Sequence, residues 1–367
     1  MRIVYDYQIF SRQARGGITR YFAEIAARIA KLPDSQVEVW AGAHFSEGLD
    51  SSLYSIIGRF VPKIRGVRVP RRALNRQFTK HHAQSTPPDV FHETYYDACY
   101  YAPTSSKRIV TVHDMILEKY LSDDPKLQED IRAKALAVRA ADHVICVSKN
   151  TRIDLLNTLP IDPSRVSVVP LGCSFSPGAP GADLARATSR PYILYVGTRD
   201  TYKNFATLLA AYNMSPRIMR DFDVVAFGSV PITSGEKDQI AALAIPLERV
   251  VHRKGNDASL ASAYAGASAF VCPSRYEGFG LPPLEAMACN CPVICSNTSS
   301  LPEVVGDAGL YFNPDDPDEL AHALETVLYD RNIADALRAA GLMRVPHFTW
   351  DQCAQATRDV YARALMR

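Results

Sequence analysis

The stretch that decides the fold is Ser274-Arg-Tyr-Glu277-Gly-Phe-Gly280-Leu-Pro-Pro-Leu-Glu285-Ala-Met-Ala288. It follows an apolar run at 269–272, which is typical of a buried parallel strand. The two prolines are helix-start residues and helix formers follow them, so the pattern predicts a strand, a glycine-bearing loop and a helix. The glycines of the loop let the backbone adopt conformations closed to other residues and allow a ligand to approach closely.

Two carboxylates flank this predicted helix start. Glu277 falls in the loop, and Glu285 falls in the expected first helical turn. A helix start offers unpaired N–H groups and a positive dipole end, which together form an anion site. A first-turn Glu can also simply complement the dipole, and paired carboxylates also serve glycosidases as acid and base. The two residues alone leave these alternatives open.

The full pattern from Glu277 to Glu285 resembles the E-x7-E motif of retaining nucleotide-sugar glycosyltransferases of the GT-B fold, family 4. The resemblance implies that Glu277 contacts the hydroxyls of the donor sugar and that Glu285 binds the nucleotide ribose. It also places the loop amides of Phe279, Gly280 and Leu281 near the sugar and the diphosphate.

Length and composition are those of a globular protein with two domains. The chain has 367 residues, with 47% hydrophobic and 22% charged residues, and no apolar run long enough for a membrane span. An acidic residue at Asp6 favours a first strand over a signal peptide. Most of the eight cysteines lie in apolar runs, which indicates buried thiols in a reducing compartment and hence a cytoplasmic location. The group Cys289, Cys291 and Cys295 has no His or paired C-x-x-C beside it, so we expect no metal there.

Apolar β-type runs alternate with helical stretches along the chain, which predicts βαβ units on parallel sheets. Strands are expected at 3–5, 37–40, 90–92, 109–112, 144–147, 166–169, 192–196, 224–227, 250–252, 269–272, 293–295 and 310–312. Helices are expected at 18–31, 126–140, 204–213, 258–266, 318–329 and 333–340, with Ser148 as the N-cap of another. The predicted α/β architecture has two doubly wound, Rossmann-like domains that face each other across a cleft. The first domain, on the acceptor side, is expected at 1–171, and the second, which binds the nucleotide sugar, is expected at 191–345. A linker at 172–190 joins them. The resemblance implies a final helix within 346–367 that returns to the first domain.

Two loops that follow strands carry further candidate residues. Gly16 and Gly17 precede a predicted helix, where glycines permit close approach of a phosphate, although a simple flexible turn is the alternative. Arg199 and Lys203 follow the strand 192–196, where they suit a diphosphate or form a solvated surface pair. The resemblance implies that the glycine-rich loop lines the donor and acceptor cleft and that the two cations neutralise the leaving diphosphate.

His113 ends the strand at 109–112. A lone His after a strand is often a structural hydrogen-bonding residue, but Thr-Val-His-Asp is similar to a first-domain element of the family that touches the donor sugar. Asp114 could cap a helix or orient His113. The pairs Asp123-Asp124 and Asp315-Asp316 could bind Mg²⁺, but both lie beside proline, as turns and helix starts do. The family has no metal-binding D-x-D, so no metal and no other cofactor is expected, and no NAD or ATP fingerprint occurs.

The resemblance implies a retaining glycosyltransferase that moves a hexose, with mannose from GDP-mannose as the expected donor. Gly16-Gly-Ile-Thr-Arg-Tyr and Thr-Val-His113-Asp are similar to bacterial mannosyltransferases that build O-antigens and exopolysaccharides, so the acceptor is expected to be a saccharide on polyprenyl diphosphate. The rival classes are a nucleotide-sugar epimerase or hydrolase of the same fold, and a protein that binds a nucleotide sugar or an anionic surface without turnover.

Residues 59–82 form a basic segment that the net charge of +2 conceals. No Asp or Glu occurs between 51 and 88. The cations of the segment are Arg59, Lys63, Arg65, Arg68, Arg71, Arg72, Arg76 and Lys80. Interleaved apolar residues suit an anionic membrane surface or the diphosphate of a polyprenyl carrier, and a solvated loop is the alternative. No nucleic-acid recognition motif accompanies the segment, so we expect peripheral attachment to the inner face of the cell membrane and no nucleic acid.

Overall fold

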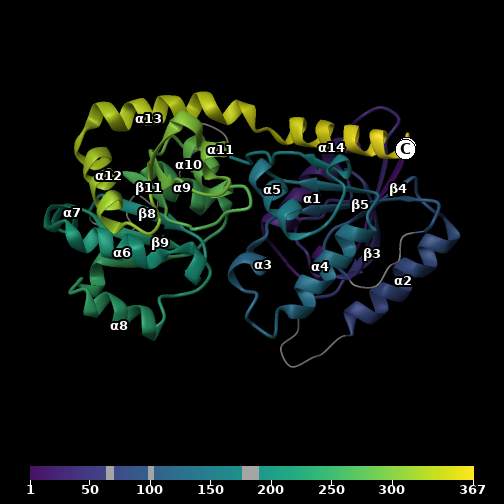
Figure 1. Ribbon diagram of the computed structural model, residues 1–367, viewed down its shortest axis with the longest axis horizontal. Coiled ribbons are helices and arrows are strands. Elements are labelled where there is room, and N and C mark those ends of the chain that lie inside the picture. Colours follow the sequence, from purple (N-terminus) through teal and green to yellow (C-terminus); the bar gives the residue numbers. More distant parts are fainter. Residues whose placement is uncertain (63–69, 98–102, 176–189) are drawn as a thin grey trace. The chain divides into compact units, whose positions relative to one another are not determined.

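The computed structural model describes residues 1–62, 70–97, 103–175 and 190–367. These residues form two compact units, one made of 1–172 with 350–367 and one made of 173–349. Each unit is built around its own parallel β-sheet (Figure 1). Residues 176–189, which hold most of the predicted linker, and 63–69 of the basic segment lie outside the described residues.

The first unit contains a seven-stranded sheet, all of whose neighbours pair in parallel. In spatial order its strands are β3 (Ser55–Phe60), β2 (Gln36–His44), β1 (Arg2–Tyr5), β4 (Val90–Glu93), β5 (Lys107–Val112), β6 (His143–Cys146) and β7 (Val166–Val168). Its α-helices are α1 (Gly17–Ile29), α2 (Arg71–Ser85), α3 (Ile116–Tyr120), α4 (Gln128–Ala140), α5 (Lys149–Thr158) and α14 (Trp350–Leu365). The chain winds outward in both directions from β1 and β4, which makes the boundary between these two strands the topological switch point.

The second unit repeats this plan with a six-stranded parallel sheet. In spatial order its strands are β10 (Val250–Arg253), β9 (Asp223–Phe227), β8 (Tyr192–Val196), β11 (Ala269–Cys272), β12 (Val293–Ser296) and β13 (Gly309–Phe312). Its α-helices are α6 (Phe205–Met214), α7 (Pro216–Asp221), α8 (Ser234–Ala242), α9 (Asp257–Gly266), α10 (Leu281–Ala288), α11 (Leu301–Val305), α12 (Pro317–Tyr329) and α13 (Arg331–Arg344). Here the switch point lies between β8 and β11.

The predicted strands are confirmed, each within a few residues of its expected bounds. Each apolar run becomes a strand of a parallel sheet, buried in the inner strands and partly exposed in the edge strands β7, β10 and β13. Ser148 caps α5 as predicted, with its Oγ accepting the Thr151 N–H at 3.0 Å. Asp316 caps α12 by accepting the N–H groups of Asp318 and Glu319, so this half of an acidic pair serves as a helix start. Cys146, Cys272 and Cys295 are buried thiols, and burial raises the pKa of Cys272 to about 12.

No helix or strand is expected from the sequence within 46–88, where the structure forms β3 and α2. The strand lies at the sheet edge and is largely exposed, and the buried residues of α2 are Asn75, Thr79 and Ala83 rather than an apolar stripe. Asn75 accepts the Ala43 N–H at 2.7 Å and donates to its carbonyl at 3.2 Å, beside the irregularity in β2 near Gly42. The helix is therefore held by a polar contact that hydropathy does not show.

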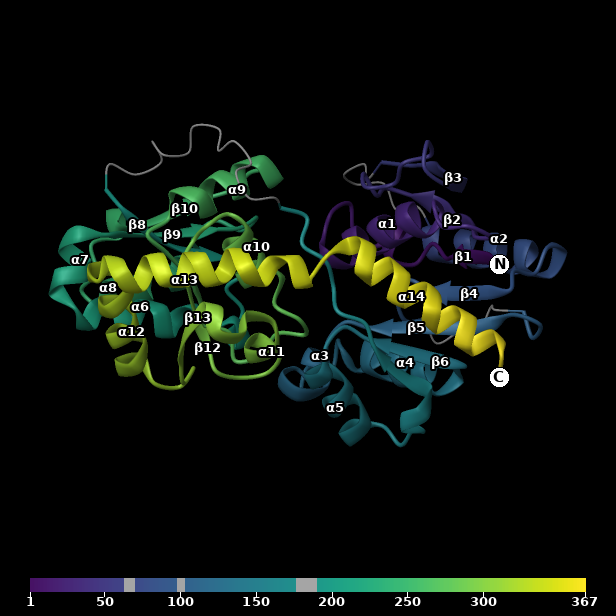
Figure 2. The same ribbon diagram turned by 90° about the horizontal axis from the view of Figure 1, so that it is seen from above.

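The final helix, α14, belongs to the first unit, where it packs against α1, β5 and β6 (Figure 2). A buried polar network anchors it. The Tyr361 hydroxyl lies 2.6 Å from His92 Nδ1 and 3.1 Å from the Tyr5 hydroxyl, and His92 Nε2 lies 2.9 Å from the Thr111 hydroxyl. Burial, with a smaller effect of His113, lowers the pKa of His92 from 6.5 to about 3, so this ring is neutral at pH 7.

This neutral histidine predicts a loss of stability in acid. A pKa that is depressed in the folded state means that the unfolded chain binds the proton first, so the contribution is complete above pH 6.5 and is lost as the pH falls toward 3. We expect the free energy of unfolding of the wild type to fall by about 2 kcal/mol more than that of His92→Gln between pH 6.5 and pH 5. Urea unfolding at both pH values measures this, with exposed His81→Gln as the matched control. Identical pH dependence of the wild type and His92→Gln would contradict the assignment.

Candidate functional site

The second unit assembles its candidate site at the carboxyl ends of β8 and β11. These strands are neighbours, with Ile193 opposite Ala269 and Leu194 opposite Phe270, so the loops that follow them lie side by side. A backbone hydrogen bond from Arg275 N–H to the Tyr202 carbonyl, at 2.8 Å, ties the two loops together. Open α/β sheets bind ligands at such a switch point.

Lys203 and Glu277 meet here across 74 residues of sequence. Lys203 Nζ donates to both oxygens of Glu277, at 2.7 and 2.9 Å, and the side chains are only 17% and 10% exposed. Burial acts to lower the pKa of Lys203, but the charge and hydrogen bonds of Glu277 outweigh it and raise that pKa. The two groups are therefore a fixed ion pair. Ser274 Oγ donates a third hydrogen bond to Glu277, at 2.7 Å.

Two serines that follow the neighbouring strand β12 hold the loop from 277 to 281 by hydrogen bonds. Ser299 Oγ accepts the Glu277 N–H at 3.0 Å, and Ser300 Oγ donates to the carbonyls of Glu277 and Phe279 at 2.8 and 2.7 Å. These serines were not among the candidate residues, although the run Ser296-Asn-Thr-Ser-Ser at a strand end is a sequence signal that points to them. Their hydroxyls hold the carbonyls and the first amide of the loop.

The next three N–H groups of this loop are available to a ligand. Those of Phe279, Gly280 and Leu281 have no hydrogen-bond partner within the described part of the chain. Gly280 takes a φ of 108°, which favours glycine, and it precedes α10 as its N-cap. Pro282 and Pro283 carry no N–H, so donors at this helix start are concentrated in the glycine loop.

Glu285 does not lie in the first helical turn, so that prediction was wrong. The helix begins at Leu281, one residue before the prolines, and this places Glu285 one turn further in. The Tyr264 hydroxyl of α9 donates to Glu285 Oε2 at 3.3 Å, and the carboxylate is nearly buried. Dipole complementarity therefore does not explain this residue, because that effect falls off within the first turn.

Arg199 lies apart from the Lys203–Glu277 pair. Its Nε and Nη2 contact Glu236 of α8, its Nη2 also donates to the Val230 and Pro231 carbonyls, and its side chain is 4% exposed. Nη1 is buried without a partner among the described residues. The structure thus brings Lys203 and Glu277 together, while Arg199 lines a separate pocket of about 600 Å³ with residues of α6 and α8.

In the first unit, Gly16 and Gly17 open α1, and α1 carries Tyr21 and Phe22 to His113. The Tyr21 and Phe22 rings meet His113 edge to face, at centroid distances of 5.1 and 6.1 Å. Burial lowers the pKa of His113 to about 4, and its Nε2 is buried without a partner in the described residues. Asp114, which precedes the N-cap residue Met115 of α3, accepts the Ile116 N–H at 3.1 Å. His113 is therefore a neutral ring with one nitrogen available to a ligand.

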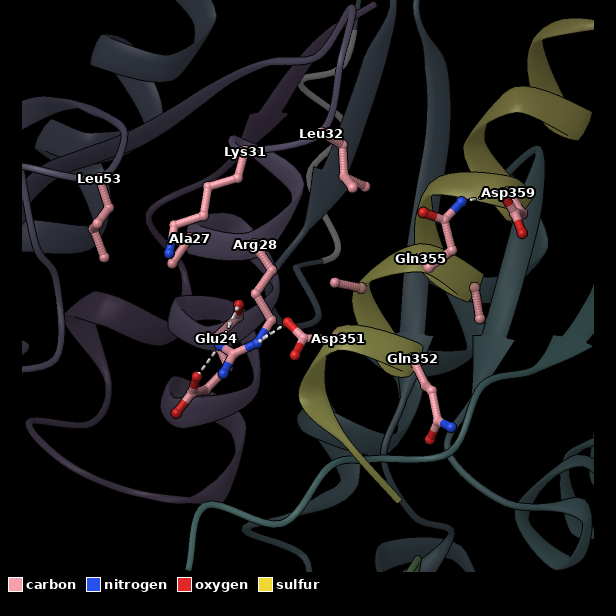
Figure 3. Close-up of a pocket in the computed structure, with 12 residues that line it drawn as sticks. Glu24, Ala27, Arg28, Lys31, Leu32, Leu53, Asp351, Gln352, Gln355 and Asp359 are labelled. Carbon is pink, nitrogen blue, oxygen red and sulfur yellow. Dashed lines mark hydrogen bonds and ion pairs between the residues drawn. The ribbon is translucent and has the colours of Figure 1, made fainter. Parts of the chain in front are cut away.

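A pocket of about 940 Å³ lies elsewhere in the first unit, between α1 and α14 (Figure 3). Arg28 lies between Glu24 and Asp351 in it, with its Nε 2.9 Å from Asp351 Oδ1. None of the residues predicted to bind substrate lines this pocket. The Arg28–Asp351 pair joins the two helices, whereas Glu24 and Arg28 both belong to α1.

Two doubly wound parallel sheets, each in its own unit, are the architecture of the GT-B fold. Comparison with known proteins gives the family. Residues 15–175 match the family model described as Glycosyltransferase Family 4, and residues 182–342 match that described as Glycosyl transferases group 1. The O-antigen chain mannosyltransferase B of Escherichia coli is 31% identical over an alignment of 372 positions, which covers 94% of this chain and 95% of that protein. The chain therefore belongs to the family of glycosyltransferases that these two models describe and that includes the E. coli relative.

Solved structures share the fold. Sucrose-phosphate synthase from Thermosynechococcus elongatus matches with a TM-score of 0.74 at 22% identity, over 99% of this chain and 98% of that one. A protein of Anabaena, solved in complex with UDP-glucose, matches with a TM-score of 0.74 at 16% identity, over 99% and 100%. None of the helices among the described residues combines the length and apolarity needed to cross a membrane.

Proposed function

We propose that this enzyme transfers mannose from GDP-mannose to a saccharide carried on polyprenyl diphosphate, with retention of the anomeric configuration, in the assembly of a surface polysaccharide. The observation that carries the proposal is the site at the β8–β11 switch point, where the Lys203–Glu277 pair lies beside three consecutive amides that have no partner among the residues the structure describes. The choice of mannose and of a surface polysaccharide is supported by the E. coli relative, whose name assigns it to O-antigen chains.

Each group of the site has a part in this reaction. Glu277 accepts hydroxyl hydrogens of the donor sugar, and Glu285 with Tyr264 behind it binds the ribose. Lys203 and the amides at 279–281 stabilise the charge that develops on the departing diphosphate, as donors preorganised in a site of low dielectric do. The neutral ring of His113 donates or accepts at Nε2 toward the sugar.

The reaction forms a bond between an acceptor oxygen and C1 of mannose and breaks the bond between C1 and the diphosphate oxygen. The proton of the acceptor hydroxyl passes to the leaving diphosphate, on the same face of the sugar. This route requires no covalent nucleophile and no metal, because Lys203 and the loop amides supply positive charge.

Incubation with GDP-mannose, with and without acceptor, tests the proposal against its rivals. A transferase needs the acceptor for fast turnover, a hydrolase releases mannose without it, and a binding protein does neither. We expect turnover to survive EDTA and the first product to keep the anomeric configuration of the donor by NMR. Inversion, or an absolute requirement for Mg²⁺, would contradict the mechanism.

We further propose that the protein attaches peripherally to an anionic membrane at the inner face of the cell membrane. Phe60 and Leu74 are 51% and 54% exposed, and the cations Arg59 and Lys80 are exposed near them in sequence. Apolar residues among cations suit such a surface. The patch is smaller than the sequence suggested, because Arg72 and Arg76 pair with Asp97, an acid that lies beyond the acid-free span of 51–88.

A further inference from the structure

A second pocket lies at the switch point of the first sheet. Tyr7 and Gln8 follow β1, and Tyr96 and Asp97 follow β4, so these residues leave the carboxyl ends of adjacent strands. Together with residues of the α2 start they enclose a cavity of about 110 Å³. The position matches that of the Lys203–Glu277 site in the other sheet, and it is where doubly wound sheets bind ligands.

Three arginines line this cavity: Arg12, Arg71 and Arg72. The single carboxylate in it, Asp97, is 3% exposed and is already matched, because Arg76 contacts it at 2.7 Å and Arg72 at 3.3 Å. Arg12 contacts Asp130 at 3.1 Å, but both side chains are at least a third exposed, so this pair contributes little. The cavity therefore has an excess of positive charge.

Arg71 is the arginine without a carboxylate among the described residues. Its Nη2 donates to the carbonyls of Val61 and Pro62, and its Nε is buried with no partner there. A buried guanidinium N–H without an acceptor costs free energy, which an anionic oxygen in the cavity would recover. The start of α2 adds to this preference, since it has no acidic residue in its first turn and no side-chain cap.

The size of the cavity restricts the ligand. Pockets for drug-sized molecules are about 300–1,000 Å³, so a cavity of about 110 Å³ takes a phosphate-sized group rather than a nucleotide. We propose that this pocket binds the phosphate groups of the diphosphate that carries the acceptor saccharide, with Arg71 and Arg12 as its ligands. This inference rests on the proposed function for the source of the diphosphate, while the anion site itself rests on the contacts above.

Inorganic pyrophosphate is the probe. Thermal unfolding of the whole protein is followed with GDP at saturating concentration, so that the nucleotide site of the second unit is filled before pyrophosphate is added. Pyrophosphate should raise the melting temperature of the wild type by mass action. Arg71→Gln should weaken pyrophosphate binding about tenfold or more, because it removes a charged donor to an anion.

Two further variants show whether the loss of pyrophosphate binding is specific to Arg71. Arg132→Gln, the same change at an exposed position of α4, should leave pyrophosphate binding at the wild-type level. Arg71→Lys should restore part of it, since the charge is kept while the fork of donors is lost. Equal pyrophosphate binding by the wild type and Arg71→Gln would overturn the site, whatever the outcome with GDP-mannose.

The source of the anion is decided by two further arms. The KM for a diphosphate-linked acceptor should rise about tenfold in Arg71→Gln, with an unchanged KM for the same saccharide on an uncharged alkyl chain. An equal rise for both would overturn the assignment to the diphosphate. Vesicles of phosphatidylglycerol should bind the wild type and Arg71→Gln alike, and loss of vesicle binding in the variant without any effect of pyrophosphate on the wild type would assign Arg71 to a lipid headgroup instead.

Discussion

Exchange of Glu277 for glutamine should lower the turnover number of glycosyl transfer by about 100- to 1,000-fold, the range measured when one preorganised polar group of an active site is removed. Glutamine keeps the shape and one acceptor oxygen but removes the charge that fixes Lys203, whose Nζ lies 2.7 Å from Glu277 Oε1. The affinity for GDP should change little, because GDP lacks the sugar that Glu277 contacts. Initial rates and calorimetric titration with GDP measure the two effects separately.

Matched variants decide between a role on the sugar and a role in the fold. Glu248→Gln makes the same change at an exposed position of the second unit and should keep wild-type activity. Glu285→Ala should instead weaken GDP binding, since its expected partner is the ribose. A parallel loss of GDP binding and turnover in Glu277→Gln, or full activity, would rule out the assignment of Glu277 to the donor sugar.

Exchange of Arg108 for methionine should destabilise the first unit by about 3–5 kcal/mol, the usual cost of removing one partner of a buried ion pair. Arg108 Nε lies 2.6 Å from Glu93 Oε1, and the side chains are 2% and 1% exposed. Burial acts to raise the pKa of Glu93, and the charge and hydrogen bonding of Arg108 act against this rise. Without Arg108 the carboxylate has to be buried alone or take up a proton. We expect a fall in melting temperature of roughly 10 °C.

The double variant Arg108→Met with Glu93→Leu tests whether the stability lost in Arg108→Met is due to the unpaired carboxylate of Glu93. Replacing both members of a buried pair by apolar residues is often neutral or stabilising, so the double variant should recover most of the lost stability. Arg132→Met, on the exposed face of α4, should leave the melting temperature almost unchanged. Additive losses in the double variant would show that Arg108 stabilises the unit by packing rather than by its charge.

The sequence was sufficient for every strand of the two sheets except β3, and for the loop that carries Glu277. Strands such as β8 and β11 are buried on both faces, so they are continuous apolar runs whose length and neighbours identify them. The glycine loop between β11 and α10 is equally visible, because its backbone needs glycine and its helix start favours proline. The edge strand β3 and the polar helix α2 were not visible, since neither has an apolar face of regular period.

Only the tertiary structure determined which charges meet. The spacing of Arg199 and Lys203 suggested one clamp on one diphosphate, but the structure pairs Lys203 with Glu277 and Arg199 with Glu236. Likewise, the cations of α2 had no acid in their own segment, and Asp97 reaches Arg72 and Arg76 from the loop after β4. Local sequence determines which residues form a strand, a loop or a helix start, because these depend on hydrogen bonds and torsions within a few residues. Which loops become neighbours depends on the order of strands in each sheet, and this order is set by packing between segments that lie tens of residues apart.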